Sequence, residues 1–171
     1  MTRHPAARFI TAAALIVGLS GCLSLGGEPP ESLLTLNAEA RAPVGSGASA
    51  AGRPVIAIAA LDAPAKLDVL RVPVAVTETE VAYLKEAFWV EKPARLFRRL
   101  LGETIRARGN GMVIDGDETA TLATVTMQGT LAEMGYDAPS QSVIVQFDAV
   151  RIGDGGSVTT RRFEARESGI A

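Results

Sequence analysis

The sequence has few of the residues on which enzyme and metal sites most often depend. Its 171 residues include one cysteine, Cys22, and one histidine, His4. Because both lie within the first 22 positions, the rest of the chain has no Ser-His, Cys-His or His-metal arrangement. Carboxylates, lysines and hydroxyls are the catalytic groups that remain. We therefore predict that the protein is not an enzyme and that it holds neither a cofactor nor a metal ion.

Disulfides and an excess of charge of one sign are also missing. A lone cysteine forms no bond within the chain, which excludes a disulfide framework. The chain has 17 basic and 19 acidic residues, so its net charge of −2 indicates no nucleic-acid partner. Hydrophobic residues make up 47% of the sequence, a fraction that is typical of a folded protein.

Two short motifs resemble ligand sites but lack essential parts of them. The acidic run DGDE at 115–118 has neither the spacing nor the length of a calcium-binding EF-hand loop. The GNG run at 109–111 lacks the lysine and the spacing of a phosphate-binding P-loop. We interpret the first as a solvated turn and the second as a helix end followed by a turn.

The first 22 residues have the pattern of a lipoprotein signal. Arg3 and Arg8 precede an apolar stretch at 9–19 that is shorter than the about 20 residues of a membrane-spanning helix. Leu-Ser-Gly-Cys at 19–22 resembles the lipobox, before whose cysteine a signal peptidase cuts. We predict that 1–21 is removed and that Cys22 carries a diacylglyceryl group and a further acyl chain such as palmitate.

That lipid would anchor the protein, because two or more acyl chains give stable membrane attachment where one does not. The alternative is a secreted protein in which Cys22 has no such role. Leu23 follows the cysteine where aspartate would retain a lipoprotein in the inner membrane, which favours the outer membrane.

Composition divides the chain after the signal into a tether and one domain. Residues 22–32 contain Gly, Pro and Ser and show no helical or strand periodicity, which predicts a lipidated tether. Extended, ten residues of it reach roughly 35 Å. The remaining residues, 33–171, are of ordinary length for a single domain, inside which 41–53 predicts a flexible loop.

Four stretches in the first half of this domain predict strands. Residues 33–38 form a short possible strand, and 54–64 is apolar on both faces, as in a strand that is covered on both sides. Residues 70–76 contain Pro73, which predicts a position at the sheet edge. Residues 80–90 are expected to return beside that strand.

The clearest element is a helix over 92–109. Pro93 suits its first turn, and Gly109 is a typical residue at a helix end. Apolar residues at helical spacing predict the stripe that packs on the sheet. This stripe comprises Phe97, Leu100, Leu101 and Ile105.

Alternation of apolar and polar residues predicts three successive strands at 120–134, 142–152 and 157–168. The DGG run at 154–156 predicts a hairpin turn between the last two. We expect an antiparallel three-strand meander, half buried against the helix. The predicted fold class is therefore α+β, with a mixed, largely antiparallel sheet packed against at least one helix.

Two groups of side chains are candidates for binding. Tyr83, Phe88 and Trp89 are three of the few aromatic residues. They either pack on the sheet or at the start of the helix, or they contact a partner or an acyl chain. The predicted helix also carries several arginines, which either bind lipid headgroups or form a solvated face. These are Arg95, Arg98, Arg99, Arg106 and Arg108.

A diffuse pattern over residues 19–165 resembles the ABC-type transport auxiliary lipoprotein family, the PqiC-like proteins. After the lipobox come a Leu-Asp segment, a basic strand, a tyrosine-containing segment that ends in tryptophan, and a Pro-x-Arg-Leu helix start. The pattern residues are Leu67, Asp68, Arg71, Tyr83, Trp89, Pro93, Arg95 and Leu96.

The resemblance implies a lipoprotein of the cell envelope that faces the periplasm and works with an MCE-type lipid transport system. Its partners would be an MCE-domain protein, an ABC permease and an ATPase. The implied role is docking or assembly without catalysis. The alternative is a lipoprotein of another class, either a secretion pilot or a carrier of a hydrophobic ligand.

One feature departs from the family pattern. Family members usually continue into a C-terminal amphipathic helix, whereas this sequence stops soon after the last predicted strand. We expect either a truncated sequence or a sheet face that a partner or a second copy covers; in the last case the protein would be a homo-oligomer.

Overall fold

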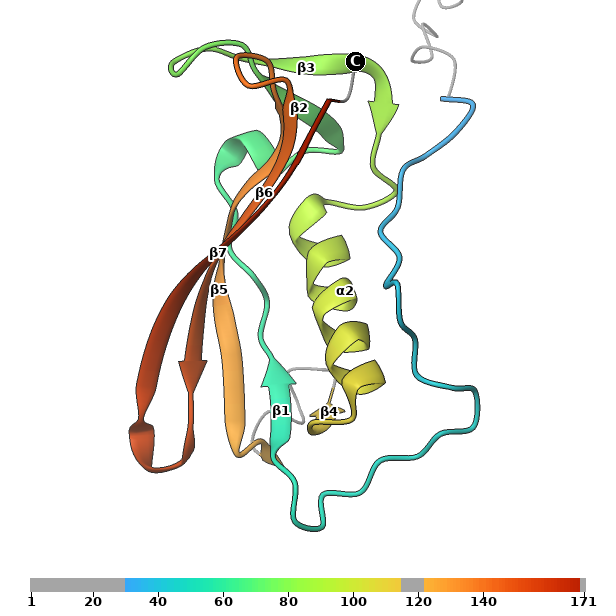
Figure 1. Ribbon diagram of the computed structural model, residues 1–171, viewed down its shortest axis with the longest axis vertical. Coiled ribbons are helices and arrows are strands. Elements are labelled where there is room, and N and C mark those ends of the chain that lie inside the picture. The colour runs from blue at the N-terminus through green and yellow to red at the C-terminus, as the bar shows by residue number, and fades with distance from the viewer. Residues whose placement is uncertain (1–29, 115–121, 170–171) are drawn as a thin grey trace, which may run out of the picture. The chain divides into compact units, whose positions relative to one another are not determined.

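The structure is a computed structural model that describes residues 30–114 and 122–169. Almost all of them belong to one structural unit, Glu31–Ala171. In this unit helix α2 (Pro93–Arg108) packs with a mixed sheet of seven strands (Figure 1). The predicted α+β class is confirmed. The strands are β1 (Val55–Ile58), β2 (Arg71–Ala75), β3 (Val81–Phe88), β4 (Met112–Ile114), β5 (Val125–Asp137), β6 (Ser142–Ile152) and β7 (Val158–Ser168).

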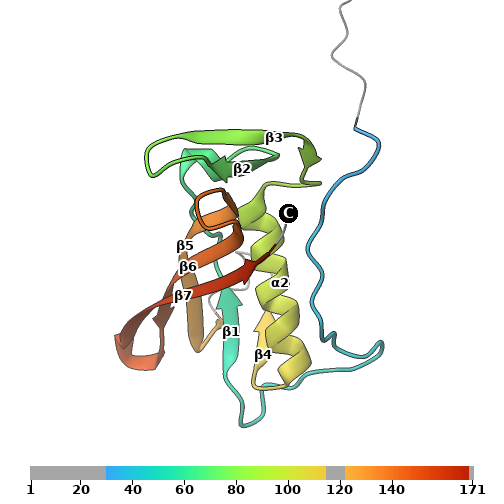
Figure 2. The ribbon, with the colours of Figure 1, turned by 45° about the horizontal axis from the view of Figure 1, so that its top comes forward.

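Strand β5 is the centre of the sheet. Strand β6 pairs antiparallel with it along almost its whole length, so β1 and β2 share its other edge, both parallel to it. Strands β3 and β4 complete the sheet beside β2 and β1. Strand β7 pairs with β6, which confirms the predicted C-terminal meander. The other view places β2 and β3 across one end of α2 (Figure 2).

The helix has the ends that its sequence predicts. Pro93 occupies the first turn, where a missing N–H costs nothing. Gly109 ends the helix with a φ of 66°, and its N–H donates to the Arg106 carbonyl at 3.0 Å. All four residues of the predicted stripe are half-buried, and Phe97 packs against the core cluster. Leu96 and Gly102 are more buried, and Leu100 lines a groove between the helix and the chain before β1.

One cluster of buried apolar side chains joins α2 to the sheet. Leu67 and Leu131 are fully buried at its centre, and the Phe97 and Phe147 rings meet edge to face with centroids 5.1 Å apart. The contacts cross from the helix to β2, β5 and β6, so they hold the layers together. The cluster comprises Leu67, Val72, Trp89, Leu96, Leu131 and Met134.

A register shift in β5 explains how this strand supplies two core residues of opposite parity. The predicted alternation holds as far as Leu131. Between Leu131 and Glu133 the pairing with β6 shifts, so that Met134 also points into the core. Sequence alternation gives no sign of such a bulge.

Strand β5 also approaches the backbone of β6 closely at Gly129, whose φ is +155°. A Cβ there would lie 2.1 Å from the Asp148 carbonyl oxygen. We expect Gly129→Ala to lower the free energy of unfolding by about 2 kcal/mol or more, because the backbone of β6 would have to move. Gly47→Ala is the control, since no heavy atom lies within 4 Å of its Cβ position. Equal urea midpoints for the two variants would contradict this prediction.

Three predicted elements differ from the structure. The strand predicted at 33–38 is reduced to one isolated bridge between Leu34 and Trp89. The edge position predicted from Pro73 is wrong, because β2 lies between β3 and β5. A register shift between Arg71 and Pro73 interrupts the pairing at the proline. Strand β1 ends at Ile58, although the chain continues beside β5 to Asp62.

The half-buried meander is confirmed for β5 and β6 but is wrong for β7. Every residue of β7 is exposed, including Phe163, whose partner Phe147 is buried.

Charged side chains occupy both faces of this strand, which discourages pairing with other chains. Arg162 forms a bidentate ion pair with Asp148, in which Nε donates to Oδ1 at 2.6 Å and Nη2 donates to Oδ2 at 2.7 Å. These hydrogen bonds lower the pKa of the Asp148 carboxyl.

Candidate functional site

The predicted anchor lies outside the part of the chain that the structure describes. This applies to Cys22, to the signal at 1–21 and to the acidic run at 115–118, so their interpretations remain predictions. Within residues 30–114 and 122–169, no helix is long and apolar enough to cross a membrane. The same residues contain no group of three His, Cys, Asp or Glu side chains placed to hold a metal ion.

The three predicted aromatic contacts have different surroundings. Trp89 is only 8% exposed and belongs to the core, and its Nε1 has no hydrogen-bond partner among the described residues. Tyr83 is half-buried, donates its hydroxyl to the Lys66 carbonyl at 3.3 Å and lies under the Arg71 guanidinium. Phe88 is also half-buried. A partner contact by these residues remains a prediction, for which Tyr83 and Phe88 have exposed surface and Trp89 has little.

Aliphatic side chains next to these aromatics are more exposed, and sequence reasoning missed them. Backbone hydrogen bonds join Trp89 to Leu70 and Val90 to Leu34, so these segments are neighbours at the end of β3. Large hydrophobic residues usually lie inside a protein, so a group of them at one place indicates a contact surface. We name as the apolar rim Leu34, Leu70 and Val90 at this end of β3 together with Leu84 earlier on the same strand; all four are 41–46% exposed.

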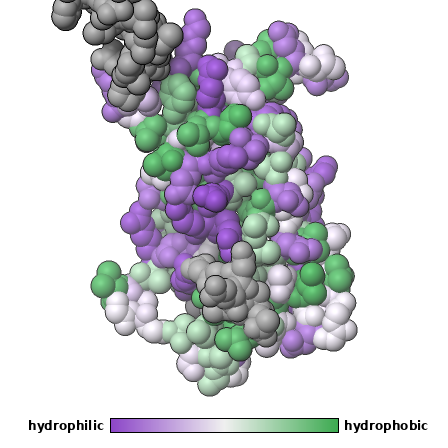
Figure 3. Space-filling view, turned by 180° about the vertical axis from the view of Figure 1, so that it is seen from behind, coloured by the Kyte–Doolittle hydropathy of each residue, from purple (hydrophilic) through white to green (hydrophobic). Residues whose placement is uncertain are grey.

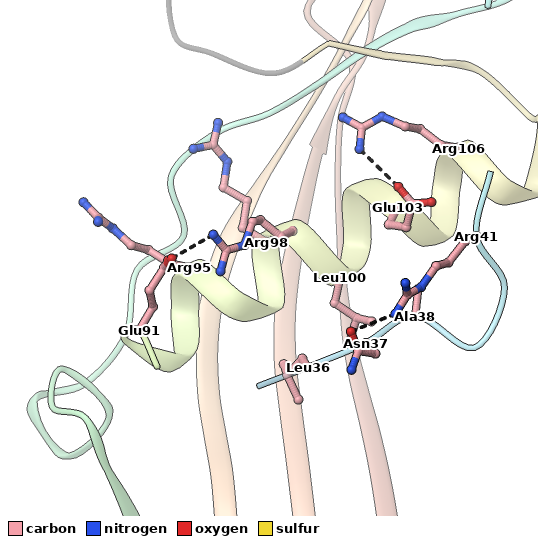
Figure 4. Close-up of a pocket in the computed structure, with 11 residues that line it drawn as sticks. Leu36, Asn37, Ala38, Arg41, Glu91, Arg95, Arg98, Leu100, Glu103 and Arg106 are labelled. Carbon is pink, nitrogen blue, oxygen red and sulfur yellow. Dashed lines mark hydrogen bonds and ion pairs between the residues drawn. The ribbon is translucent and has the colours of Figure 1, made fainter. Parts of the chain in front are cut away.

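A second surface feature is a groove between α2 and the chain before β1. In both ribbon views this chain runs alongside the helix (Figure 1, Figure 2). The groove has a volume of about 850 Å³ (Figure 4). We name it the arginine groove, because five of its residues are arginines. Its lining is Leu36, Asn37, Ala38, Arg41, Glu91, Arg95, Arg98, Arg99, Leu100, Glu103 and Arg106.

One wall of the groove is a single face of helix α2. Arg95, Arg99, Glu103 and Arg106 recur at intervals of three or four residues and therefore share one face of α2. Seen from behind, hydrophilic residues form a broad patch across the middle of the molecule (Figure 3).

Hydrogen bonds hold the opposite wall. The Ala42 N–H donates to Glu103 Oε1 at 2.8 Å, and Arg41 Nη2 donates to Asn37 Oδ1 at 2.8 Å. Leu36 packs against the core cluster and so fixes the start of this wall. This contact was not predictable from the sequence, because an irregular segment has no periodic pattern that indicates its neighbours.

The groove carries more positive than negative charge. Its five arginines face two glutamates, Glu91 and Glu103. Arg99 pairs with Glu91 at 2.8 Å, and Arg106 lies 3.6 Å from Glu103. Arg98 Nε donates to the Ile58 carbonyl at 2.8 Å. The Arg95 guanidinium is exposed and has no partner among the described residues.

The sequence matches a known family over most of its length. The family model described as ABC-type transport auxiliary lipoprotein component matches residues 34–170. The chain therefore belongs to this family, which confirms the resemblance found in the sequence. Membership supports a role that is associated with ABC-type transport and with the cell envelope. No curated protein matches the sequence.

Two solved structures share the fold. Protein XCC0632 from Xanthomonas campestris, of the DUF330 family, is 12% identical with a TM-score of 0.62, and the alignment covers 80% of this chain and 77% of that one. An uncharacterized protein of known crystal structure is also 12% identical, with a TM-score of 0.57 and coverage of 67% and 73%. At this identity the two likenesses establish the fold alone.

Proposed function

We propose that the protein is the membrane-anchored auxiliary lipoprotein of an MCE-type ABC lipid transport system. The observation that carries the proposal is the family match over residues 34–170. The protein would act as a docking or assembly component, and its partners would be an MCE-domain protein, the ABC permease and the ATPase. It would perform no catalysis, in agreement with the scarcity of histidine and cysteine in its sequence.

The anchor is the lipid proposed on Cys22. The lipobox supports it, and Leu23 favours the outer membrane with the folded domain facing the periplasm. The proposed tether, 22–32, would let the domain stand clear of the headgroups while it remains bound to the bilayer.

The apolar rim is the surface that we assign to the protein partners. Leu70, Leu84 and Val90 expose aliphatic side chains on or next to β3, the strand that also carries Tyr83 and Phe88. A surface of aliphatic and aromatic side chains suits a protein interface, because the centre of such an interface is depleted in charge and enriched in aromatic residues.

Affinity purification from the native envelope tests the proposal. The full chain with a C-terminal tag is extracted in mild detergent, and co-purified proteins are identified by mass spectrometry. We expect MCE, permease and ATPase subunits, and we expect Leu84→Glu to reduce their recovery more than the exposed control Thr160→Glu on β7. Recovery of secretion-system subunits, or of a stoichiometric lipid without transporter subunits, would support another class of lipoprotein and overturn the proposal.

A further inference from the structure

We propose that the arginine groove binds the phosphate of a phospholipid headgroup, with the glycerol and the first acyl carbons of that lipid against Leu36 and Leu100. The inference rests on the groove itself and does not depend on the transport role proposed above. Its ligand differs from the covalent lipid on Cys22, because the groove would hold a separate lipid molecule.

Charge identifies the phosphate as the recognised group. The chain as a whole has a net charge of −2, yet the groove gathers five arginines against two glutamates. A guanidinium presents five N–H donors in a planar fork that matches phosphate oxygens in pairs, whereas a lysine provides only a point charge. Arginine is the sole basic residue in this lining, which is the composition expected of a site for phosphate oxygens.

Several donors of the groove are available to a ligand. Arg95 has no partner among the described residues and is exposed. Arg99 uses Nη1 in its contact with Glu91, and its side chain is 60% exposed. Arg41 belongs to the other wall and uses Nη2 in its bond to Asn37 (Figure 4). The groove therefore has guanidinium groups from both α2 and the chain before β1 in its lining.

The apolar residues favour a lipid over an acidic peptide. Leu36 and Leu100 lie in the same lining as the arginines and are half-buried, so they offer apolar surface next to the cations. A phospholipid joins a phosphate to apolar carbons within one small molecule, whereas an acidic peptide would leave these two leucines uncovered. The volume of about 850 Å³ lies within the range of about 300–1,000 Å³ for small-molecule sites.

The position of the groove along the chain agrees with this ligand. Leu36 follows Cys22 by fourteen residues, which span roughly 50 Å when extended. If Cys22 carries its lipid, the wall formed by residues 36–41 is therefore within reach of the membrane surface. The covalent anchor would then raise the local concentration of headgroups at the groove.

Titration of the purified full chain in non-ionic detergent tests the inference. The probes are dihexanoyl phosphatidylglycerol, inorganic phosphate and a polyglutamate peptide, and the thermal midpoint is measured as each is added. We expect the lipid to raise the midpoint in a saturable manner and at lower concentrations than inorganic phosphate. The double variant Arg95→Glu and Arg99→Glu should weaken lipid binding at least tenfold.

A matched double variant separates the groove from general charge. Arg108→Glu and Arg161→Glu change the net charge equally at exposed arginines outside the groove, so this protein should bind within twofold of wild type. Arg95→Gln removes a charge that has no partner in the described part of the chain, so it should keep the fold while weakening binding several-fold. Three results would overturn the inference. These are an equal loss of lipid affinity in both double variants, a stronger response to phosphate or polyglutamate than to the lipid, and no response to any probe.

Discussion

Replacing Leu131 by alanine should lower the free energy of unfolding by about 2–5 kcal/mol, which is the range measured for large-to-small changes in protein cores. Leu131 is fully buried on the central strand β5, among residues of α2, β2 and β6. Its removal would leave a cavity at the point where helix and sheet meet, and the close-packed surroundings would refill that cavity only in part. This change would remove a large fraction of the stability of a domain of this size.

Urea denaturation, followed by circular dichroism, measures this loss. Leu122→Ala is the matched control, because this leucine is 70% exposed and its truncation should change stability by no more than about 0.5 kcal/mol. The dependence on urea should keep its slope in both variants, since the same surface is exposed on unfolding. A Leu131→Ala protein as stable as the control would contradict the assignment of the core to this layer.

Replacing Cys22 by serine should abolish the attachment of lipid. The thiol is the acceptor in the proposed modification, and no other cysteine in the sequence can replace it. Cells grown with radiolabelled palmitate should incorporate label into the wild-type protein and none into Cys22→Ser. Intact mass should also show a mature wild-type chain that begins at Cys22 and is heavier than its sequence by the mass of the acyl groups.

The control for this prediction is Ser24→Ala, which lies two residues beyond the cysteine and outside the lipobox. It should keep the full amount of label. Label in the Cys22→Ser protein, or a wild-type chain of unmodified mass, would remove the proposed anchor and with it the assignment of the domain to a membrane surface.

Local patterns predicted the regular elements of the fold well. Pro93 and Gly109 define the ends of the helix because each has a backbone preference of its own, which needs no information about neighbours. The alternation in 142–152 predicts the bounds of β6 to the residue, and Phe147 on its apolar face is buried, although Val143 on the same face is exposed.

The errors occur where a distant segment decides the outcome. Pro73 carries the signal of an edge strand, yet β5 pairs with β2 beyond it, and sequence alone does not reveal that neighbour. Strand β7 alternates like β6, but nothing in the described chain covers it, so its alternation does not result in burial. A periodic pattern of apolar residues identifies the apolar face of a helix or strand. It does not indicate whether another element packs on that face.

The candidate sites follow the same rule. The sequence shows several arginines on the predicted helix, but Arg41 lines the same groove from an irregular segment 54 residues before Arg95. The aromatics were conspicuous because they are few, yet Trp89 proved to be a core residue, and the exposed apolar surface beside it is aliphatic.

Cross-linking in intact cells tests the central claim, the association with an ABC lipid transport system, most directly. Lys85 and Lys92 are exposed near the apolar rim, so a lysine-reactive cross-linker would capture a partner seated there. We predict cross-linked peptides that join these lysines to the MCE-domain protein or the permease. Cross-links only to unrelated envelope proteins, in a sample where the MCE, permease and ATPase subunits are linked to one another, would contradict the account.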